Sequence, residues 1–422
     1  MRCLVVGNGG REHALAAALA RAASVSAVFV TRPNAGTARI AEAVDVAPTD
    51  VDGVVSAAQS LQIGLVVIGP EAPLVAGLAD RLDALNIPVL GPTAAAAQLE
   101  GSKQFAKELM SEANIPTAAY GVFESSAEAI AFVRSQGRPM VVKADGLAAG
   151  KGVIVPETIQ ETEDAIRNIL DGGAFGGAGA RVVVEELMVG PEVSVIGLVH
   201  GETVRPFPAS RDHKRALDGD LGPNTGGMGA FSPVPALDPS TYAATVQDVL
   251  GAAARAMSAR GTPYRGFLYA GLMLTPDGPR VLEFNCRMGD PECQPLMQRL
   301  KSDAGVLFLA AATGKLAEAD LRFNDQPSVC VVLASGGYPG RYPKGIAITG
   351  LKAAEEVEGV TVYHAGTRQA GEAVVTSGGR VLGVTAQGTT FQEAISRAYQ
   401  AADHIQFEGK QLRRDIGASA LR

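Results

Sequence analysis

The sequence has few cysteines, no long hydrophobic run and no excess of positive charge. Its four cysteines, Cys3, Cys286, Cys293 and Cys330, form no C-x-x-C pair, which argues against a disulfide scaffold or a structural zinc site. No apolar run is long enough to span a bilayer. Met1 leads directly into a strand-like run, without the features of a signal peptide. We therefore expect a cytoplasmic protein with no membrane as a partner.

The charge balance is acidic, with a formal net charge of −7. Nucleic-acid-binding proteins present basic surfaces, so this balance argues against nucleic acid as a partner, although it leaves room for local cationic pockets. Hydrophobic residues make up 47% of the chain, which with mixed charges is typical of a globular protein. A length of 422 residues exceeds what one hydrophobic core normally organises and predicts two to four domains.

The first hundred residues alternate β-rich runs with alanine-rich helical stretches. Strands are predicted at 3–6, 26–30, 65–68 and 88–90, with a helix at 12–22 between the first two. This pattern predicts a parallel sheet with helices on both faces, which binds ligands at the carboxyl ends of its strands.

The rest of the chain mixes strands and helices in a different pattern. Ser102 is suited to begin a helix over 102–113. The segment 205–239 is rich in glycine, proline and charge, and we expect loops over a site there. Turn residues at 275–279 predict a hairpin. The expected strands are 140–143, 152–155, 181–185, 193–199, 266–274, 280–284, 328–335, 361–364 and 380–387.

The sequence GNGGREH at residues 7–13 places a glycine loop between a strand and a helix. Backbone N–H groups at a helix N-terminus stabilise an anion. Glu12 stands where the dinucleotide-binding fingerprint has its third glycine, and no acidic residue follows the second strand. These departures oppose a nicotinamide dinucleotide and favour a phosphate monoester, with Arg11 and the turn at Asn34 and Gly36 nearby. A purely structural turn is the alternative.

A second glycine-rich segment, VVKADGLAAGKGV at residues 141–153, carries two lysines. Gly152 stands where a P-loop has its magnesium-binding Ser or Thr, so this is not a P-loop. Lys143 and Lys151 nevertheless frame a loop that can lie over a polyphosphate and neutralise it from two sides. Lys103 begins a helix, where the helix dipole disfavours a cation, and a bound anion would resolve that conflict.

The apolar run at 181–185 leads into a loop that contains Glu185, Glu186 and Glu192. Backbone groups at such a strand exit can bind the edge of an adenine, and a carboxylate beyond it can accept ribose hydroxyls. The alternative is an ordinary acidic strand end.

The strongest motif is RVLEFNCRMGDPE at residues 280–292. Side chains of a strand alternate between its faces, so Glu283 and Asn285 should share one face while Leu282 and Phe284 face the core. Two hard oxygen ligands suit a magnesium ion that also takes water and phosphate oxygens. Arg287 follows as a cation for a carboxylate or a transferring phosphoryl group.

Two further loops, DHKR at 212–215 and GPNTGGMG at 222–229, combine small residues with polar ones. Their backbone could approach a substrate closely, and ordinary glycine-rich turns are the alternative reading.

Together these motifs resemble the phosphoribosylamine–glycine ligase family of the ATP-grasp group. The resemblance covers essentially the whole chain and includes GPEAPLV at 69–75, GGYPG at 336–340 and HAGT at 364–367. It implies a multidomain α/β and α+β protein. The implied domains are an N-terminal Rossmann-like parallel α/β substrate domain at 1–102, two ATP-grasp lobes that hold the nucleotide, and a small C-terminal α+β domain at 327–422. The first lobe, 103–190, would be a flexible lid, and the second, 191–326, would carry the metal site.

The resemblance also implies roles for individual residues. ATP would contact Lys103, Lys143, Gly146, Gly150, Lys151, Gly152, Glu185, Glu186, Leu187 and Glu192. Phosphoribosylamine would contact Gly9, Gly10, Asn34, Gly36 and Glu71. Glycine and its phosphorylated intermediate would contact Asp212, Asn224, Thr225, Gly226, Gly227 and Arg287. Magnesium or manganese would be bound by Glu283 and Asn285. The catalytic residues would be Arg287, Lys143 and Asp212.

The implied reaction joins glycine to 5-phosphoribosylamine in purine biosynthesis, through glycyl phosphate and with ATP converted to ADP. Positioning and charge neutralisation would drive it, without a nucleophilic side chain. Small departures from the family occur at Arg32, Pro33, Pro191 and Met288. The strand 267–274 has no second metal-binding carboxylate, so the number of metal ions stays open. A monomer or weak homodimer is expected. Rival readings are another ATP-grasp ligase or carboxylase, a nicotinamide-dependent oxidoreductase, and a nucleotide-sensing module.

Overall fold

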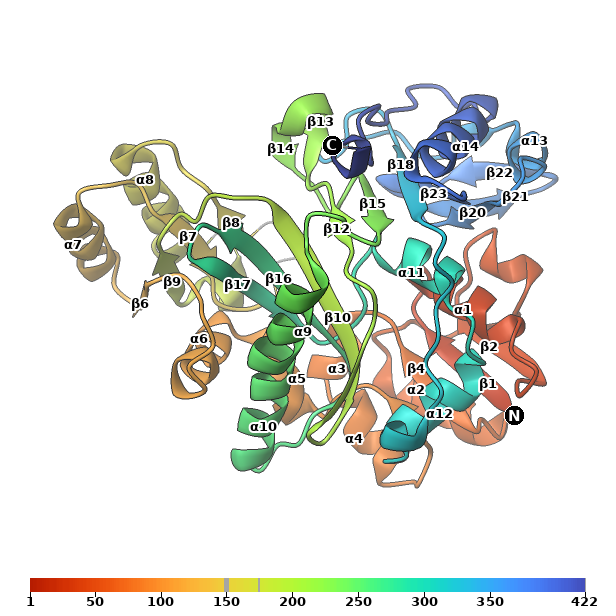
Figure 1. Ribbon diagram of the computed structural model, residues 1–422, viewed down its shortest axis with the longest axis horizontal. Coiled ribbons are helices and arrows are strands. Elements are labelled where there is room, and N and C mark those ends of the chain that lie inside the picture. The colour runs from red at the N-terminus through yellow and green to blue at the C-terminus, as the bar shows by residue number, and fades with distance from the viewer. Residues whose placement is uncertain (148–151, 174, 422) are drawn as a thin grey trace.

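The computed structural model describes residues 1–147, 152–173 and 175–421. Figure 1 shows an N-terminal domain at the lower right, a central antiparallel sheet and a C-terminal part above them, with a small lobe projecting to the left. Within the described residues, no helix is long and apolar enough to cross a membrane.

The N-terminal domain is a parallel sheet of strand order β3-β2-β1-β4-β5. Leu4 and Val6 face one core, whereas Cys3 and Val5 face the other, so helices cover both faces, as predicted. Such double burial explains the continuous apolar runs of these strands. The elements are β1 (Arg2–Val6), α1 (Gly10–Ala20), β2 (Ala27–Thr31), β3 (Glu42–Val44), α2 (Val51–Ser60), β4 (Leu65–Ile68), α3 (Glu71–Val75), α4 (Leu78–Asp83), β5 (Val89–Leu90) and α5 (Ala94–Gly101).

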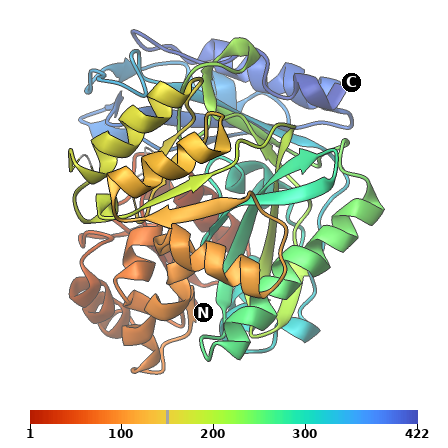
Figure 2. The same cartoon turned by 90° about the vertical axis from the view of Figure 1, so that its left-hand side faces the viewer.

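The projecting lobe follows helix α6 (Lys103–Glu112) and contains an antiparallel sheet of order β6-β9-β7-β8. Helices α7 and α8 pack on this sheet around a hydrophobic core of the lobe's own. Figure 2 views the molecule from the side of this lobe. Its elements are β6 (Tyr120–Phe123), α7 (Ser126–Gln136), β7 (Val141–Ala144), β8 (Val153–Ile154), α8 (Ile159–Leu170) and β9 (Val182–Glu185).

The central sheet has the order β11-β10-β16-β17 and is antiparallel. The predicted hairpin is confirmed as β16 and β17, but its register shifts, so that Leu282 is an extra residue between Val281 and Glu283. This β-bulge breaks the expected alternation, because both Val281 and Phe284 lie in the main core while Leu282 packs in a small separate cluster. The strands are β10 (Glu192–His200), β11 (Thr203–Pro206), β16 (Arg265–Thr275) and β17 (Gly278–Asn285), flanked by α9 (Pro239–Thr245), α10 (Ala252–Ala259), α11 (Cys293–Arg299) and α12 (Ala304–Ala312).

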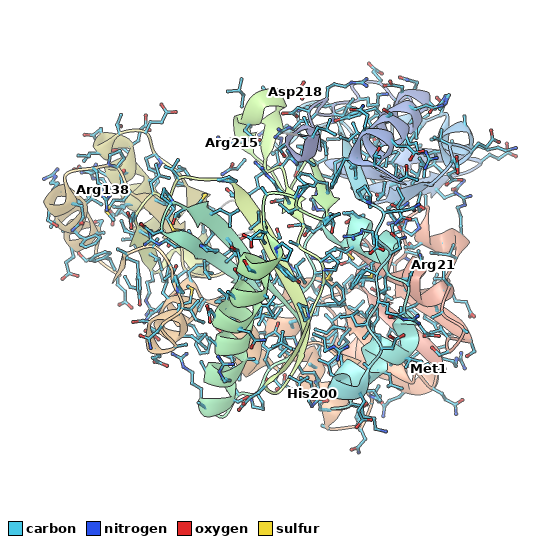
Figure 3. The ribbon with its side chains drawn as sticks, in the orientation of Figure 1. Met1, Arg21, Arg138, His200, Arg215 and Asp218 are labelled. Carbon is cyan, nitrogen blue, oxygen red and sulfur yellow. The ribbon has the colours of Figure 1, made fainter. Side chains whose placement is uncertain are left out.

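The C-terminal sheet has the order β12-β15-β18-β23-β20 and draws two strands from residues 211–232. The prediction of loops throughout 205–239 was therefore wrong, because short strands between glycines and prolines gain their stability from distant partners. Figure 3 marks the hairpin β13–β14 by Arg215 and Asp218. The elements are β12 (Arg211–Asp212), β13 (Arg215–Leu217), β14 (Leu221–Asn224), β15 (Gly229–Ser232), β18 (Ser328–Ala334), β19 (Ala347–Ile348), α13 (Leu351–Glu355), β20 (Val360–His364), β21 (Thr367–Ala370), β22 (Ala373–Thr376), β23 (Arg380–Gln387) and α14 (Phe391–His404).

The N-terminal domain meets the C-terminal part at a buried pair of histidines. The backbone N–H of His364 donates to Nδ1 of His13 at 2.8 Å, and the Asn34 side chain donates to the carbonyl of His364 at 2.7 Å. Burial lowers the pKa of His13 to about 3 and that of His364 to about 4, so both rings are neutral at pH 7. Gly36 lies directly against both rings, which leaves no room for a side chain.

Replacing Gly36 with alanine should therefore weaken this interface. The added Cβ would collide with the rings of His13 and His364, and overpacking of this kind costs about 1–3 kcal/mol. We expect a melting temperature several degrees lower in thermal unfolding. Gly64→Ala is the control, because its Cβ would lie 3.5 Å from the Cβ of Met1, an ordinary contact. Equal melting temperatures for the two variants would contradict the proposed packing.

Candidate active site

Glu283 and Asn285 lie on β17 beyond the bulge, opposite Gly271 and Tyr269 of β16. Their spacing in this regular register places both side chains on one face, as the sequence predicts. Burial would raise the pKa of Glu283, but nearby cations lower it to about 2, so this carboxylate is ionised. Those cations are Lys103, Lys214, Lys143 and Arg287.

The oxygen donors Glu283 and Asn285 fit a hard divalent cation. The described residues contain no cluster of three or more His, Cys, Asp or Glu side chains that could hold a metal ion. An ion bound at Glu283 and Asn285 would therefore need water and phosphate oxygens to complete its coordination, which is how magnesium is commonly bound beside nucleotides.

The bulge at Leu282 also links the central sheet to the projecting lobe. Lys143 at the end of β7 donates to the carbonyl of Leu282 at 2.9 Å. Its ammonium group also pairs with Glu185, and Lys107 of α6 pairs with the same carboxylate at 2.6 Å. Burial would raise the pKa of Glu185, but the two lysines lower it below its ordinary value. Burial lowers the pKa of Lys107 to about 8, despite the attraction of Glu185.

The sequence suggested that an anion binds at the N-terminus of α6, beside Lys103. In the structure a carboxylate of the protein, that of Asp145, occupies this position. Asp145 accepts from the Ser102 hydroxyl at 3.0 Å and from the backbone N–H of Gln104 at 3.1 Å. This contact anchors the start of the predicted phosphate-binding loop beside Lys103. Gly146 has a φ of +141°, a conformation that favours glycine. The predicted contacts of Gly150 and Lys151 lie outside the described residues.

The loop after β9 carries the other predicted nucleotide contacts. Glu186 pairs with Arg280 at 3.3 Å and with Arg138 at 3.7 Å, while the Leu187 side chain is 43% exposed. Glu192 begins β10 and forms a salt bridge of 3.0 Å with Lys214. The backbone N–H of Glu186 donates to the carbonyl of Ala119 at 2.9 Å, so this N–H is already bonded within the protein.

Asp212, at the end of β12, is held by Lys214 at distances of 3.1 and 3.2 Å. The attraction of Asp212 and Glu192 raises the pKa of Lys214 well above its ordinary value, against the effect of burial. Lys214 therefore remains a cation. It bridges the carboxylates of Asp212 and Glu192 and places them next to the face of β17 that carries Glu283.

The glycine-rich loop at 224–227 is positioned by the C-terminal part. The N–H of Gly226 donates to the Tyr338 hydroxyl at 3.0 Å, and Arg380 donates to the Gly226 carbonyl. Thr225 bonds through its hydroxyl to the carbonyl of Lys214 at 2.8 Å. Gly227 has a φ of +112°, and its α-carbon is packed against Pro291. Asn224 is exposed.

Arg287 is not a free cation, because two carboxylates hold it. Its guanidinium pairs with Glu71 at 3.3 Å and with Glu100 at 2.8 Å. These carboxylates come from α3 and α5, so the ion pairs join the N-terminal domain to the central sheet. Burial would raise the pKa of Glu71, but Arg287 and Arg11 lower it, so Glu71 is ionised at neutral pH.

At the N-terminal loop, the anion beside the helix end is Glu12. Its carboxylate accepts from the N–H of Gly9 at 2.6 Å and from Arg11 at 2.6 Å. Glu12 stands where the dinucleotide-binding fingerprint has its third glycine. Its carboxylate therefore occupies part of the space in which this loop would bind an anion. Gly10 faces Gln294, since a Cβ there would lie 2.7 Å from the Gln294 amide nitrogen.

Several supporting residues were not predicted from the sequence, namely Glu100, Lys107, Tyr338 and Arg380. Lys107 follows Lys103 by one helical turn, and this i,i+4 spacing could have shown that both lysines reach the same side. Glu100 is the one acidic residue of an alanine-rich helix, which was a weaker signal. Tyr338 and Arg380 bond to Gly226, which lies more than a hundred positions away in the sequence. No local pattern indicates this role.

A parallel α/β domain, a small antiparallel lobe, and a second sheet joined to that lobe through Lys143 define an ATP-grasp protein. The N, ATP-grasp (A) and C domains of phosphoribosylglycinamide synthetase match residues 1–100, 101–293 and 328–419. The chain belongs to the phosphoribosylamine–glycine ligase family.

Individual relatives support this assignment over the whole length. The phosphoribosylamine–glycine ligase of Vibrio cholerae is 51% identical over 424 residues, covering 100% of this chain and 99% of the relative. That of Yersinia pestis is also 51% identical, over 425 residues and with the same coverage. The crystal structure of the Thermotoga maritima ligase has a TM-score of 0.85 at 33% identity, covering 98% of this chain and 100% of that one. Biotin carboxylase from Campylobacter jejuni, 15% identical with a TM-score of 0.75, covers 99% of this chain and 94% of that one and shares the fold.

The ion pair between Lys107 and Glu185 can be tested by a double-mutant cycle. Among the described residues, Lys107→Met leaves the buried carboxylate paired with Lys143 alone, and we expect a cost of about 2 kcal/mol. Glu185→Gln leaves two buried lysines without their acid in the wild type but only Lys143 in the Lys107→Met background, so it should cost less stability in that background than in the wild type. Lys315→Met, at an exposed position, is the control. Additive effects of the two substitutions would contradict the coupling.

Proposed function

We propose that the protein joins glycine to 5-phosphoribosylamine, with ATP converted to ADP and phosphate, and forms glycinamide ribonucleotide for purine biosynthesis. The observation that carries this proposal is the arrangement of Glu283 and Asn285 on one strand face, surrounded by cations from several parts of a chain that matches the family throughout. Such a site suits transfer of a phosphoryl group, because its negative charge needs neutralisation from several directions.

The nucleotide would lie between the projecting lobe and the central sheet. In this proposal Lys103, Lys143 and the loop from Gly146 to Gly152 bind its phosphates, and the segment from Glu185 to Leu187 meets the adenine. Glu192 would hold the ribose. Within the expected lobe at 103–190, the part from β6 to β9 has its own core, whereas Leu109 and Met110 of α6 pack in the main core. The part from β6 to β9 would move as a unit to close over ATP and exclude water, since an acyl phosphate hydrolyses easily.

Glu283 and Asn285 would hold magnesium or manganese. When bound, the metal ion would offset the charge of the ATP phosphates. The donor set is compatible with this ion, because Glu283 is ionised and Asn285 supplies a neutral oxygen on the same face.

Glycine would bind near Asp212, the loop 224–227 and Arg287. Its carboxylate attacks the γ-phosphorus of ATP, so a bond from carboxylate oxygen to phosphorus forms and ADP leaves. The amine of phosphoribosylamine, held near Gly9, Gly10, Asn34, Gly36 and Glu71, then attacks the carbonyl carbon and releases phosphate. The Asn34 amide is already bonded to the carbonyls of Asn8 and His364, so its contribution would be to shape the loop.

Other ATP-grasp ligases would share the nucleotide and metal residues but act on a different acid and amine. A non-catalytic nucleotide sensor would bind ATP without turnover. Measuring ADP release with glycine and phosphoribosylamine, supplied together and singly, separates these readings. We further propose that the protein acts in the cytoplasm as a monomer or weak homodimer.

The metal assignment predicts that Glu283→Gln loses at least about 10²-fold in kcat. The substitution removes a charge from the metal site without creating a cavity, so the circular dichroism spectrum should be unchanged. Glu202→Gln, at an exposed position, should retain full activity as the control. A Glu283→Gln variant with most of the wild-type activity would refute this role.

The proposed acyl phosphate predicts the fate of oxygen atoms from glycine. Glycine labelled with heavy oxygen in both carboxylate positions should deliver one labelled atom to inorganic phosphate in each turnover, with the other retained in the amide product. Mass spectrometry of the released phosphate measures this transfer. Label in AMP would indicate adenylation instead, and unlabelled phosphate would exclude glycyl phosphate even if the net reaction were confirmed.

A further inference from the structure

One short segment, residues 289–294, connects the two regions where the proposed substrates bind. On one side, a Cβ at Gly9 would lie 3.7 Å from a carboxylate oxygen of Asp290, and one at Gly10 would lie 2.7 Å from the amide of Gln294. On the other side, the charges of Asp212 and Lys214 act on the carboxylate of Glu292, and they respectively raise and lower its pKa. The segment therefore reaches the amine-binding loop through Asp290 and Gln294 and the glycine site through Glu292.

Glu292 is 3% exposed, and its carboxylate is held in a defined position. The hydroxyl of Ser194 on β10 donates to Oε1 of Glu292 at 3.1 Å, and the same hydroxyl lies 3.0 Å from the hydroxyl of Tyr269 on β16. Lys214 is the cation that acts most strongly on Glu292, but its ammonium group is bonded to Asp212 and Glu192. Among the residues that the structure describes, Glu292 is thus a positioned carboxylate that forms no ion pair of its own.

The charges around Glu292 give it a proton affinity suited to exchange at neutral pH. Burial and the negative charge of Asp212 raise the pKa of Glu292 to about 7, against the opposing effects of Lys214 and Ser194. The other titratable groups that face it are Tyr269, Arg287, Cys293 and Cys330. A buried acid that titrates near the working pH can accept and release a proton during turnover.

We propose that Glu292 is the general base of the amide-forming step, positioned by Ser194 and Tyr269. This inference rests on the proposed function. As the phosphoribosylamine nitrogen bonds to the carbonyl carbon of glycyl phosphate, the bond from that carbon to the bridging oxygen breaks, and phosphate leaves with the electron pair. The proton lost by the nitrogen passes to the Glu292 carboxylate, which returns it to water before the next cycle.

A different role for Glu292 would be to bind the ammonium group of glycine together with Asp212. The two roles act on different steps. A base for the second step affects the reaction after ADP has formed, whereas a glycine anchor affects glycine binding and the formation of ADP itself. The time course of ADP in a single turnover therefore distinguishes them.

The decisive variant is Glu292→Gln, which keeps the size of the side chain and can still accept from Ser194. With ATP, glycine and phosphoribosylamine all present, we expect kcat to fall by about 10²-fold and the KM for glycine to stay within about twofold. Rapid quenching should show a burst of about one ADP per active site, because the first step is intact and the second is slow. Glu202→Gln should show wild-type rates and no burst.

The pH dependence provides a second readout. The base must be unprotonated, so wild-type kcat should fall as the pH drops below about 7, and this limb should be absent in Glu292→Gln. Ser194→Ala removes a donor that lowers the pKa of Glu292, so its limb should move to higher pH. This shift tests the proposal independently of whether Glu292→Gln folds.

Two results would overturn the role of Glu292 while leaving the proposed function intact. One is a Glu292→Gln variant with kcat within threefold of wild type. The other is a raised KM for glycine without an ADP burst, which would assign the residue to glycine binding. Wild-type protein that forms no ADP in response to glycine and phosphoribosylamine would instead refute the proposed function.

Discussion

The rest of the site depends on the mutual attraction of buried charges around β17. The negative charge of Glu283 partly offsets the positive charges of four residues that belong to segments far apart in the chain. These residues are Lys103, Lys143, Lys214 and Arg287. Bringing cations together in a region of low dielectric is unfavourable unless acids accompany them. The partners Glu185, Asp212, Glu71 and Glu100 meet that need, so the N-terminal domain, the lobe and the central sheet are all oriented by the same set of ion pairs.

The fold was most predictable where local patterns and tertiary packing agree. Strand 65–68 is apolar throughout because both faces of its sheet are buried, and the hairpin at 266–284 carries its own turn residues. Prediction failed at 205–239, where the pairing of β15 with β18 joins residues about a hundred positions apart. It also failed at Leu282, since a bulge depends on contacts with the partner strand and leaves no mark in the alternation itself.

The candidate site followed a similar division. Side chains with distinctive chemistry, such as Lys143, Glu283 and Arg287, were found because their types and spacing indicate phosphate and metal binding, and the structure brings these three together. The groups that orient them were missed. Arg380 and Glu100 reach the site from other domains, so only the folded chain reveals that each restrains a loop or a charge. The sequence around Arg380 and Glu100 does not distinguish either residue from an ordinary charged surface residue.

The shared C-terminal sheet has a consequence for the order of folding during synthesis. Strand β15 can pair with β12 at once, but it leaves the ribosome about a hundred residues before β18, its neighbour on the other side. The N-terminal domain, by contrast, pairs strands that are close in sequence and can complete its sheet early. Until β18 arrives, β15 presents an unpaired edge to the surroundings, which is a known route to aggregation. Nascent chains halted between residues 240 and 320 would therefore be the ones most in need of chaperones.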